Sequence, residues 1–421
     1  MKKILILSYF YPPCNLTASQ RLGNFVKHLP SNDYYPIVIT RQWTGKELDE
    51  YQLLSSTSES TTIKKNSSSE IHYLPYKSSL RDRLLILSET YPFLRICSKS
   101  ITFLLIFFQY FTVRAIPFSN LYRYADSLLS KDSAIRTVLI SVSPFESLFF
   151  GYLLKRKYPY INWVADYRDD WTTTDIHTIP FKWLAKYSEK KWSSTASAII
   201  SVSPYLTSKI EKFVEVPGFT IYNSFDEFID YEDKKEDDVF RITYNGTLYE
   251  TQPIEVFLTG VKQFVTNYPN TNIHLYFPGI LIDTIQASRV RLFLFGFEHI
   301  FTMTERLPQK EVLDLQTKSD LLLMVAHRDI KGIPSSKVFE YISLKKEFIV
   351  CPTDYDVLHE IALNSSLGII LKDSSEVYSF LLARIIENNM KGTEKSISRM
   401  EDYKTSHQVK KLSDVLKNLK N

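Results

Sequence analysis

The clearest pattern in the sequence is an alternation of short apolar runs with longer stretches whose apolar residues recur at helical spacing. Residues 4–7 form a continuous apolar run, as a parallel strand covered on both faces requires. A polar, proline-containing loop follows over 8–20, and the pattern then predicts a helix over 18–29 and a strand over 37–40. This order of strand, loop, helix and strand is a βαβ unit, so we predict an α/β protein.

The alternation continues to residue 226, stops over an acidic stretch, and then restarts. Further strands are predicted over 138–142, 163–165, 198–202, 240–244, 273–277, 321–325 and 348–350, with second-half helices over 254–267 and 309–317. Residues 227–238 are rich in Asp and Glu and poor in packing residues, which is typical of a linker. We therefore predict Rossmann-like domains over 1–226 and 239–395, joined by this linker and followed by a helical tail over 396–421.

Two segments depart from the alternation. Residues 53–70 are dominated by Ser, Thr and Lys, which indicates a solvated loop without chemistry. Residues 101–113 are nearly all apolar or aromatic, lie between basic residues, and are too few to span a bilayer as a helix, which needs about 20. A helix partly immersed in an anionic membrane surface, formed by the region 91–118, and a buried core helix both fit this pattern.

Length and composition narrow the class of protein. A chain of 421 residues exceeds what one core usually serves, so two domains are expected. A net charge of +4 is too small for a protein whose main partner is nucleic acid. The three cysteines are far apart and match neither a zinc site nor a disulfide framework, which favours a reducing cytoplasm.

The most informative motif is Gly-Ile-Pro-Ser-Ser-Lys-Val-Phe-Glu-Tyr, residues 332–341. Pro334 precedes two serines at a predicted helix start, whose free N–H groups would face an anion such as phosphate. Glu340 lies about one turn further along, where its carboxylate could accept hydrogen bonds from a ribose diol. An ordinary capped helix with a surface glutamate also fits this local pattern.

With this motif, the chain resembles the GT-B glycosyltransferases, in particular the retaining family-4 enzymes of bacterial polysaccharide assembly. The resemblance implies two Rossmann-like domains facing each other across a cleft, with a C-terminal helix returning to the first domain. It also implies that Glu340 holds the donor ribose and that Ser335 and Ser336 face the diphosphate. Three further segments match in order and spacing: the loop at 9–21, the Asp-Tyr-Arg-Asp-Asp-Trp loop at 166–171, and the glycine turn at 244–248.

The sequence also departs from the family. Many members carry a glutamate eight positions before the ribose-binding one, and here that position is Gly332. The paired glycines of the first loop are replaced by residues 15–18, and no Arg or Lys follows the second domain's first strand near Gly246. The charge facing the diphosphate is therefore expected from Lys337 first, with Arg328 and Lys331 as the other candidates.

These matches define the predicted site. The expected catalytic residues are Asp166, Arg168, Asp169 and Lys337, although an Asp-Arg-Asp cluster can also serve only to fix a loop. The expected donor-binding residues are Gly246, Thr247, Gln252, Arg328, Ser335, Ser336, Lys337 and Glu340. Asn15, Thr17 and Arg21 are expected on the acceptor side, and neither a metal nor another cofactor is expected.

The predicted function is metal-independent transfer of a sugar from a nucleotide diphosphate donor, a UDP- or GDP-sugar, to a hydroxyl acceptor. The acceptor is expected to be a lipid-linked glycan in capsule, exopolysaccharide or O-antigen synthesis, at the cytoplasmic face of the membrane. A sugar-nucleotide epimerase and an inactive sugar-nucleotide-binding scaffold remain alternatives. A nicotinamide oxidoreductase is a poor one, because the first loop lacks the GxGxxG spacing.

Overall fold

The computed structural model describes residues 1–14, 16–45, 50–174, 178–231, 237–387 and 397–419. The chain forms two compact units: unit 1 contains Met1–Tyr222 and Thr405–Asn421, and unit 2 contains Asn223–Lys404. Phe225 and Lys404 form an isolated parallel bridge, so the segments by which the chain enters and leaves unit 2 lie side by side. The predicted linker falls at the start of unit 2, and its residues 232–236 lie outside the described residues.

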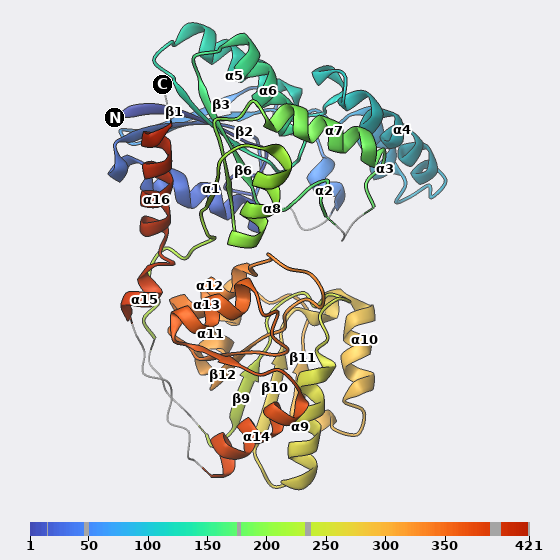
Figure 1. Ribbon diagram of the computed structural model, residues 1–421. Helices are drawn as coiled ribbons and strands as arrows, with labels where there is room; N and C mark the ends of the chain where they lie inside the picture. Colours follow the sequence, from blue (N-terminus) through green and yellow to red (C-terminus); the bar gives the residue numbers. More distant parts are fainter. Residues whose placement is uncertain (15, 46–49, 175–177, 232–236, 388–396, 420–421) are drawn as a thin grey trace. The chain divides into compact units, whose positions relative to one another are not determined.

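Unit 1 is built on an eight-stranded sheet of order β3-β4-β2-β1-β5-β6-β7-β8 (Figure 1). All neighbouring strands are parallel except β3 and β4. The strands are β1 (Lys2–Ser8), β2 (Tyr34–Arg41), β3 (Thr62–Lys65), β4 (Glu70–Leu74), β5 (Thr137–Ser141), β6 (Asn162–Tyr167), β7 (Ala198–Ser201) and β8 (Gly218–Thr220). The stretch predicted as a solvated loop thus contains β3, whose four residues are all exposed at the sheet edge.

Helices cover both faces of this sheet, which explains the continuous apolar run of β1. Ile4 and Ile6 pack with Phe25 of α1 (Thr17–His28) and Leu412 of α16 (Thr405–Asn418). Leu5 and Leu7 face the opposite side, toward α5 (Ser119–Lys131) and α6 (Ser147–Lys157). The remaining helices are α2 (Glu50–Leu54), α3 (Leu80–Leu87), α4 (Leu94–Gln109), α7 (Lys182–Ser193) and α8 (Pro204–Val214). The C-terminal helix α16 therefore completes the core of unit 1.

Unit 2 contains a six-stranded, fully parallel sheet of order β11-β10-β9-β12-β13-β14. Its strands are β9 (Phe240–Thr243), β10 (Ile273–Phe277), β11 (Phe301–Met303), β12 (Leu321–Met324), β13 (Phe348–Val350) and β14 (Gly368–Ile370). Its helices are α9 (Glu255–Asn267), α10 (Thr284–Phe293), α11 (Gln309–Lys318), α12 (Ser336–Ser343), α13 (Val357–Ser365), α14 (Ser374–Leu381) and α15 (Ile397–Glu401). Both units are thus doubly wound α/β domains, as the alternation in the sequence predicts.

Candidate functional site

The strand order of unit 2 reverses between β9 and β12, which are neighbours in the sheet although 77 residues lie between Thr243 at the end of β9 and Leu321 at the start of β12. In open α/β sheets, ligands bind outside the carboxyl ends of the strands at such a switch point. The glycine turn 244–248 follows β9, and the loop leading to α12 follows β12. The fold therefore places the two most informative motifs of the second half at the position where a ligand is expected.

Gly246 and Lys337 are in close contact at this switch point. The backbone of Gly246 has φ +89°, and a Cβ atom there would lie 3.0 Å from Cε and 3.1 Å from Nζ of Lys337. The Lys337 ammonium also lies 4.8 Å from the centroid of the Tyr244 ring and donates to the Thr247 carbonyl at 3.5 Å. Glycine is required at 246 both by its left-handed backbone and by the lysine that lies against it.

Burial lowers the pKa of Lys337 to about 8, and the Glu340 carboxylate offsets this only in part. Burial also raises the pKa of Glu340, against the opposing effects of the Gln316 amide and the Lys337 charge. Gln316 comes from α11 and is fully buried beside Glu340. The site thus holds a desolvated cation whose charge an anionic ligand would stabilise.

The N-terminus of α12 carries no side-chain cap, although Ser335 occupies the N-cap position. Its first N–H groups are therefore available to an anion, which the helix dipole also favours. Gly332 has φ +81°, and its N–H donates to the Asp356 carboxylate. A glutamate at position 332 would be strained in this conformation, which gives a physical reason for the departure from the family pattern at this position.

Asp354 accepts from the Leu358 and His359 N–H groups at the start of α13, so it stabilises that helix.

The other predicted donor residues differ in their surroundings. Gln252 is buried and holds the loop after β9 against the end of β12, because it donates to the Val325 carbonyl at 2.6 Å and accepts from the Tyr249 N–H at 3.0 Å. Its side chain supports the site from within the protein. Thr247 and Arg328 are exposed at the same sheet edge. His327, which no predicted motif included, lies three residues after the end of β12 and shares a 2.7 Å hydrogen bond with Thr251.

Unit 1 has its own switch point between β1 and β5. The predicted acceptor loop follows β1. Asn15 lies outside the described residues, and Thr17 begins α1. Arg21 and Asp166 form a buried ion pair, with Arg21 Nη2 3.0 Å from Asp166 Oδ1, and Arg21 also donates to the Ile221 carbonyl at 2.8 Å. Arg21, expected on the acceptor side, and Asp166, expected to be catalytic, therefore pair with each other in the interior.

Arg168 follows β6 and is only half-buried. Burial lowers its pKa, against the charges of Asp169 and Asp166, and among the described residues its buried Nε has no hydrogen-bond partner. Asp169 is exposed beside it, whereas Asp170 is bound by Lys209 at 2.6 Å. Arg168 and Asp169 thus remain at the sheet edge, where a ligand could reach them, while Asp166 is buried.

Glu146 is a further residue that the sequence analysis missed. It lies just after β5, at the switch point of unit 1, and burial raises the pKa of its carboxyl. No cation lies within ion-pair distance of it in the part of the chain that the structure describes. The neighbouring Phe145 stacks on Trp171, with ring centroids 5.3 Å apart. The only feature of the sequence that pointed to Glu146 was its position after a predicted strand.

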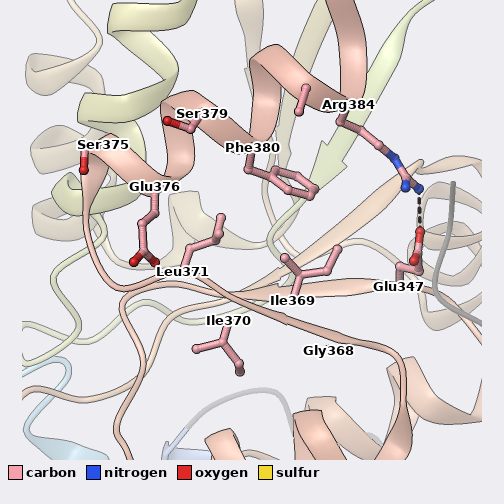
Figure 2. A pocket seen from close by; sticks show the side chains of 11 residues that line it. Glu347, Gly368, Ile369, Ile370, Leu371, Ser375, Glu376, Ser379, Phe380 and Arg384 are labelled. Carbon is pink, nitrogen blue, oxygen red and sulfur yellow. Dashed lines mark hydrogen bonds and ion pairs between the residues drawn. The ribbon is translucent and has the colours of Figure 1, made fainter. Parts of the chain in front are cut away.

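A separate hollow of about 730 Å³ lies beside the edge strand β14, against α14 (Figure 2). It is lined mainly by apolar side chains of these elements, and the ion pair between Arg384 and Glu347, 2.5 Å apart, stands at one end. None of the predicted site residues lines it. We therefore place the candidate site at the switch points and not in this hollow.

The two doubly wound domains define the fold class as GT-B, and solved structures agree. Sucrose-phosphate synthase from Thermosynechococcus elongatus matches with a TM-score of 0.63 at 11% identity, over 100% of this chain and 99% of that one. Anabaena HepE in complex with UDP and glucose matches at 0.61 and 11% identity, over 100% of both chains. A Listeria monocytogenes protein proposed to be a UDP-N-acetylglucosamine 2-epimerase matches at 0.55 and 11% identity, over 99% of this chain and 96% of that one. No protein-family model and no curated protein matches the sequence.

Proposed function

We propose that this protein is a glycosyltransferase that uses a nucleotide diphosphate sugar as donor and a hydroxyl group as acceptor. The observation that carries the proposal is the contact of Lys337 with Gly246 at the switch point of unit 2, one helical turn from Glu340. A desolvated ammonium, an uncapped helix N-terminus and a carboxylate match the diphosphate and ribose of a nucleotide. The likeness to HepE, solved with UDP and glucose, supports a UDP-sugar as the first donor to test.

In this mechanism the residues of unit 2 stabilise the leaving group. Cleavage of the glycosidic bond leaves negative charge on the diphosphate and positive charge on the anomeric carbon. Lys337 and the first N–H groups of α12 face the developing negative charge, while Glu340 accepts hydrogen bonds from the ribose hydroxyls. We propose that no metal ion takes part and that the anomeric configuration is retained, as the resemblance to family 4 implies.

We assign the acceptor to unit 1. Arg168 and Asp169 stand at the end of β6, and Glu146 stands after β5. These groups can bind or orient a hydroxyl acceptor, while the Arg21–Asp166 ion pair links α1 to β6 in the interior. We propose a lipid-linked glycan as acceptor, in a capsule, exopolysaccharide or O-antigen pathway at the cytoplasmic face of the membrane.

Calorimetric titration with UDP and GDP tests the donor site. Glu340→Ala should weaken binding of the preferred nucleotide by about tenfold to a hundredfold, because hydrogen bonds to a charged group contribute about 1.5–3 kcal/mol. Glu311→Ala on the exposed face of α11 is the matched control and should bind like the wild type. Absence of binding of either nucleotide to folded wild-type protein would contradict the proposal.

The epimerase is a second candidate, because the Listeria protein shares the fold. Incubation with UDP-sugars separates the two enzymes. A transferase releases UDP and forms a glycoside only when an acceptor is present, whereas an epimerase converts the donor sugar without one. Nucleotide binding without either reaction would favour the inactive scaffold.

A further inference from the structure

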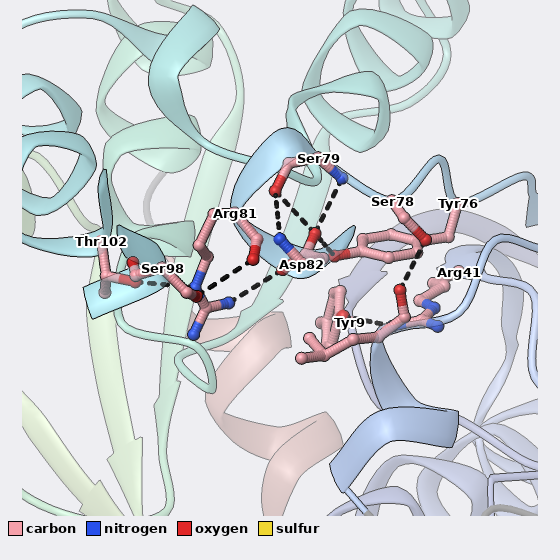
Figure 3. A network of polar contacts seen from close by, with 10 residues as sticks. Tyr9, Arg41, Tyr76, Ser78, Ser79, Arg81, Asp82, Ser98 and Thr102 are labelled. Atoms are coloured by element: carbon pink, nitrogen blue, oxygen red, sulfur yellow. Dashed lines mark hydrogen bonds and ion pairs between the residues drawn. The ribbon is translucent and has the colours of Figure 1, made fainter. Parts of the chain in front are cut away.

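Helix α4 buries polar side chains and exposes apolar ones, which is the reverse of the usual arrangement in a helix at a water-facing surface. Its buried residues are polar, Ser98 and Gln109. Figure 3 shows how this polar face is held: Arg81 Nε donates to Thr102 Oγ1 at 2.9 Å, and Ser98 Oγ donates to the Arg81 carbonyl at 3.0 Å. Arg81 is itself tied to the buried Asp82 at 3.0 Å. The inward face of α4 is therefore fixed by hydrogen bonds.

The opposite face of α4 is apolar and exposed. Ile96 is 69% exposed, and four further large apolar side chains that follow at helical spacing are more than half exposed: Phe103, Leu104, Phe108 and Phe111. A water-facing helix normally presents the reverse arrangement, with its apolar stripe toward the core. The possibility of a buried core helix, which the sequence left open, is therefore excluded, and exposed apolar surface of this extent marks an interaction site.

Helix α7 continues this face. Phe181, the residue before α7, packs on Phe103 and Phe107 with ring centroids 4.5 Å and 5.3 Å away, and Figure 1 shows α4 and α7 on the same side of unit 1. Along the exposed side of α7 stand Trp183, Tyr187 and the lysines 182, 186, 190 and 191. We call the exposed side chains of these two helices, with Phe111, the α4–α7 surface.

The charged side chains exposed on this surface are basic. Residues 91–118 contain Arg95, Lys99 and Arg114 and no acidic residue. Residues 181–193 contain four lysines and a single acidic residue, Glu189, which is buried. Lys190 pairs with Glu215 at 2.7 Å, whereas, among the described residues, neither Lys182 nor Lys186 has an acidic side chain within ion-pair distance. Basic side chains around exposed aromatic and aliphatic ones complement an anionic bilayer, where Trp and Tyr favour the headgroup level.

We infer that the α4–α7 surface docks unit 1 onto a membrane that contains anionic lipids. The apolar side chains of α4 enter the boundary between headgroups and acyl chains, and the lysines of α7 contact the lipid phosphates. None of the described helices is long and apolar enough to cross a bilayer. The inference deepens the proposed function, because docking would bring the acceptor-binding unit to a lipid-linked acceptor, but the binding itself can be measured without any reaction.

Vesicle flotation of the full-length protein tests the inference. The protein should float with vesicles that contain phosphatidylglycerol and float weakly with pure phosphatidylcholine. Lys182→Glu with Lys186→Glu should weaken binding about tenfold or more, since each basic residue near an anionic surface contributes about 1 kcal/mol. Phe103→Ser with Phe108→Ser should weaken binding to both vesicle types.

Two sets of changes elsewhere on the protein serve as controls. Lys410→Glu with Lys411→Glu, on exposed positions of α16, is the charge-matched control, and Ile285→Ser on α10 is the apolar control.

Fluorescence gives a second readout that does not depend on lost binding. The chain has five tryptophans, of which Trp183 is 72% exposed and the other four are at most 8% exposed. Vesicles should shift the emission of the wild type to shorter wavelength, and brominated lipids should quench it. Trp183→Phe should remove both effects while the protein still floats.

Two outcomes would overturn the inference. Equal, weak flotation of wild type and variants, with wild-type nucleotide binding intact, would remove the membrane and leave the donor site standing. A lipid-free dimer that the Phe103→Ser and Phe108→Ser changes convert to monomer would assign the surface to a second copy of the chain. Loss of nucleotide binding with retained flotation would instead remove the proposed function and leave the membrane surface.

Discussion

The Nζ atom of Lys337 lies 3.1 Å from the point where a Cβ atom at Gly246 would stand. Gly246 belongs to the turn after β9 and Lys337 to the first turn of α12, which follows β12, and the pairing of β9 with β12 brings them together. Under the proposed function, no Arg or Lys is needed directly after β9, because Lys337 of α12 lies against the glycine turn and supplies the cation for the diphosphate. Several predictions test this arrangement and its counterpart in unit 1.

Gly246→Ala should weaken nucleotide binding, because the new methyl group displaces the Lys337 ammonium. Gly296→Ala is the matched control: Gly296 has φ +85° against +89° for Gly246, but a Cβ atom there meets nothing within 4 Å. Both changes should lower the free energy of unfolding by about 1 kcal/mol through backbone strain. Calorimetry should show lost affinity in Gly246→Ala alone. Equal affinity in the two variants would show that the lysine does not need this space.

Lys337→Met should reduce kcat/KM for sugar transfer by about a hundredfold or more, because an electrostatic contact with the leaving group is lost. Lys337→Arg keeps the charge but is bulkier and should recover part of the rate. Steady-state kinetics with the preferred UDP- or GDP-sugar measures the effect, with Lys310→Met on the exposed side of α11 as control. Wild-type kinetics in Lys337→Met would remove the lysine from the mechanism.

Nucleotide affinity should fall as pH rises through the pKa of Lys337. In the free protein this pKa is about 8, so the site is charged below that pH. A bound diphosphate favours the ammonium and raises its pKa, so binding above pH 8 must also take up a proton. Affinity should therefore drop about tenfold between pH 7 and pH 9. Calorimetry in two buffers of different ionisation enthalpy should detect the proton uptake, and Lys337→Arg should abolish it, whereas a flat wild-type profile would contradict the assignment.

Asp166→Asn or Arg21→Ala should lower the free energy of unfolding by about 3–5 kcal/mol, because each leaves a buried charge without its partner. Arg168→Ala should cost far less stability, since its guanidinium is half-buried and its Nε has no partner among the described residues. Urea denaturation measures both. If Arg168→Ala abolishes transfer in a stable protein, the acceptor role belongs to Arg168. An Asp166→Asn variant as stable as the wild type would mean that the ion pair is not structural.

Glu146→Gln should raise the KM for the acceptor and leave nucleotide binding unchanged, because Glu146 stands at the switch point of unit 1 and the donor residues belong to unit 2. Glu211→Gln, on an exposed position of α8, is the control. Acceptor saturation curves at fixed donor concentration measure the effect. Unchanged acceptor kinetics would leave Glu146 without a role in transfer.

The sequence by itself determined the α/β class and the local form of the donor motif. Short apolar runs such as residues 4–7, bounded by polar loops, predict strands covered on both faces, and apolar residues at helical spacing between them predict helices. Residues 332–341 contain the helix start, the lysine and the glutamate within a single turn or two, so their mutual placement follows from helix geometry alone.

Only the tertiary structure decided which distant residues meet. Arg21 and Asp166 are 145 positions apart, and nothing in either local pattern indicates that one neutralises the other. Gln252 matched a donor motif in sequence, but its hydrogen bonds to Tyr249 and Val325 direct it into the protein. Helix α4 shows the same limit, because its apolar residues fit a core helix and a membrane helix equally well. Periodicity reports that a face is apolar, whereas the order of strands and the packing of neighbouring helices decide what that face contacts.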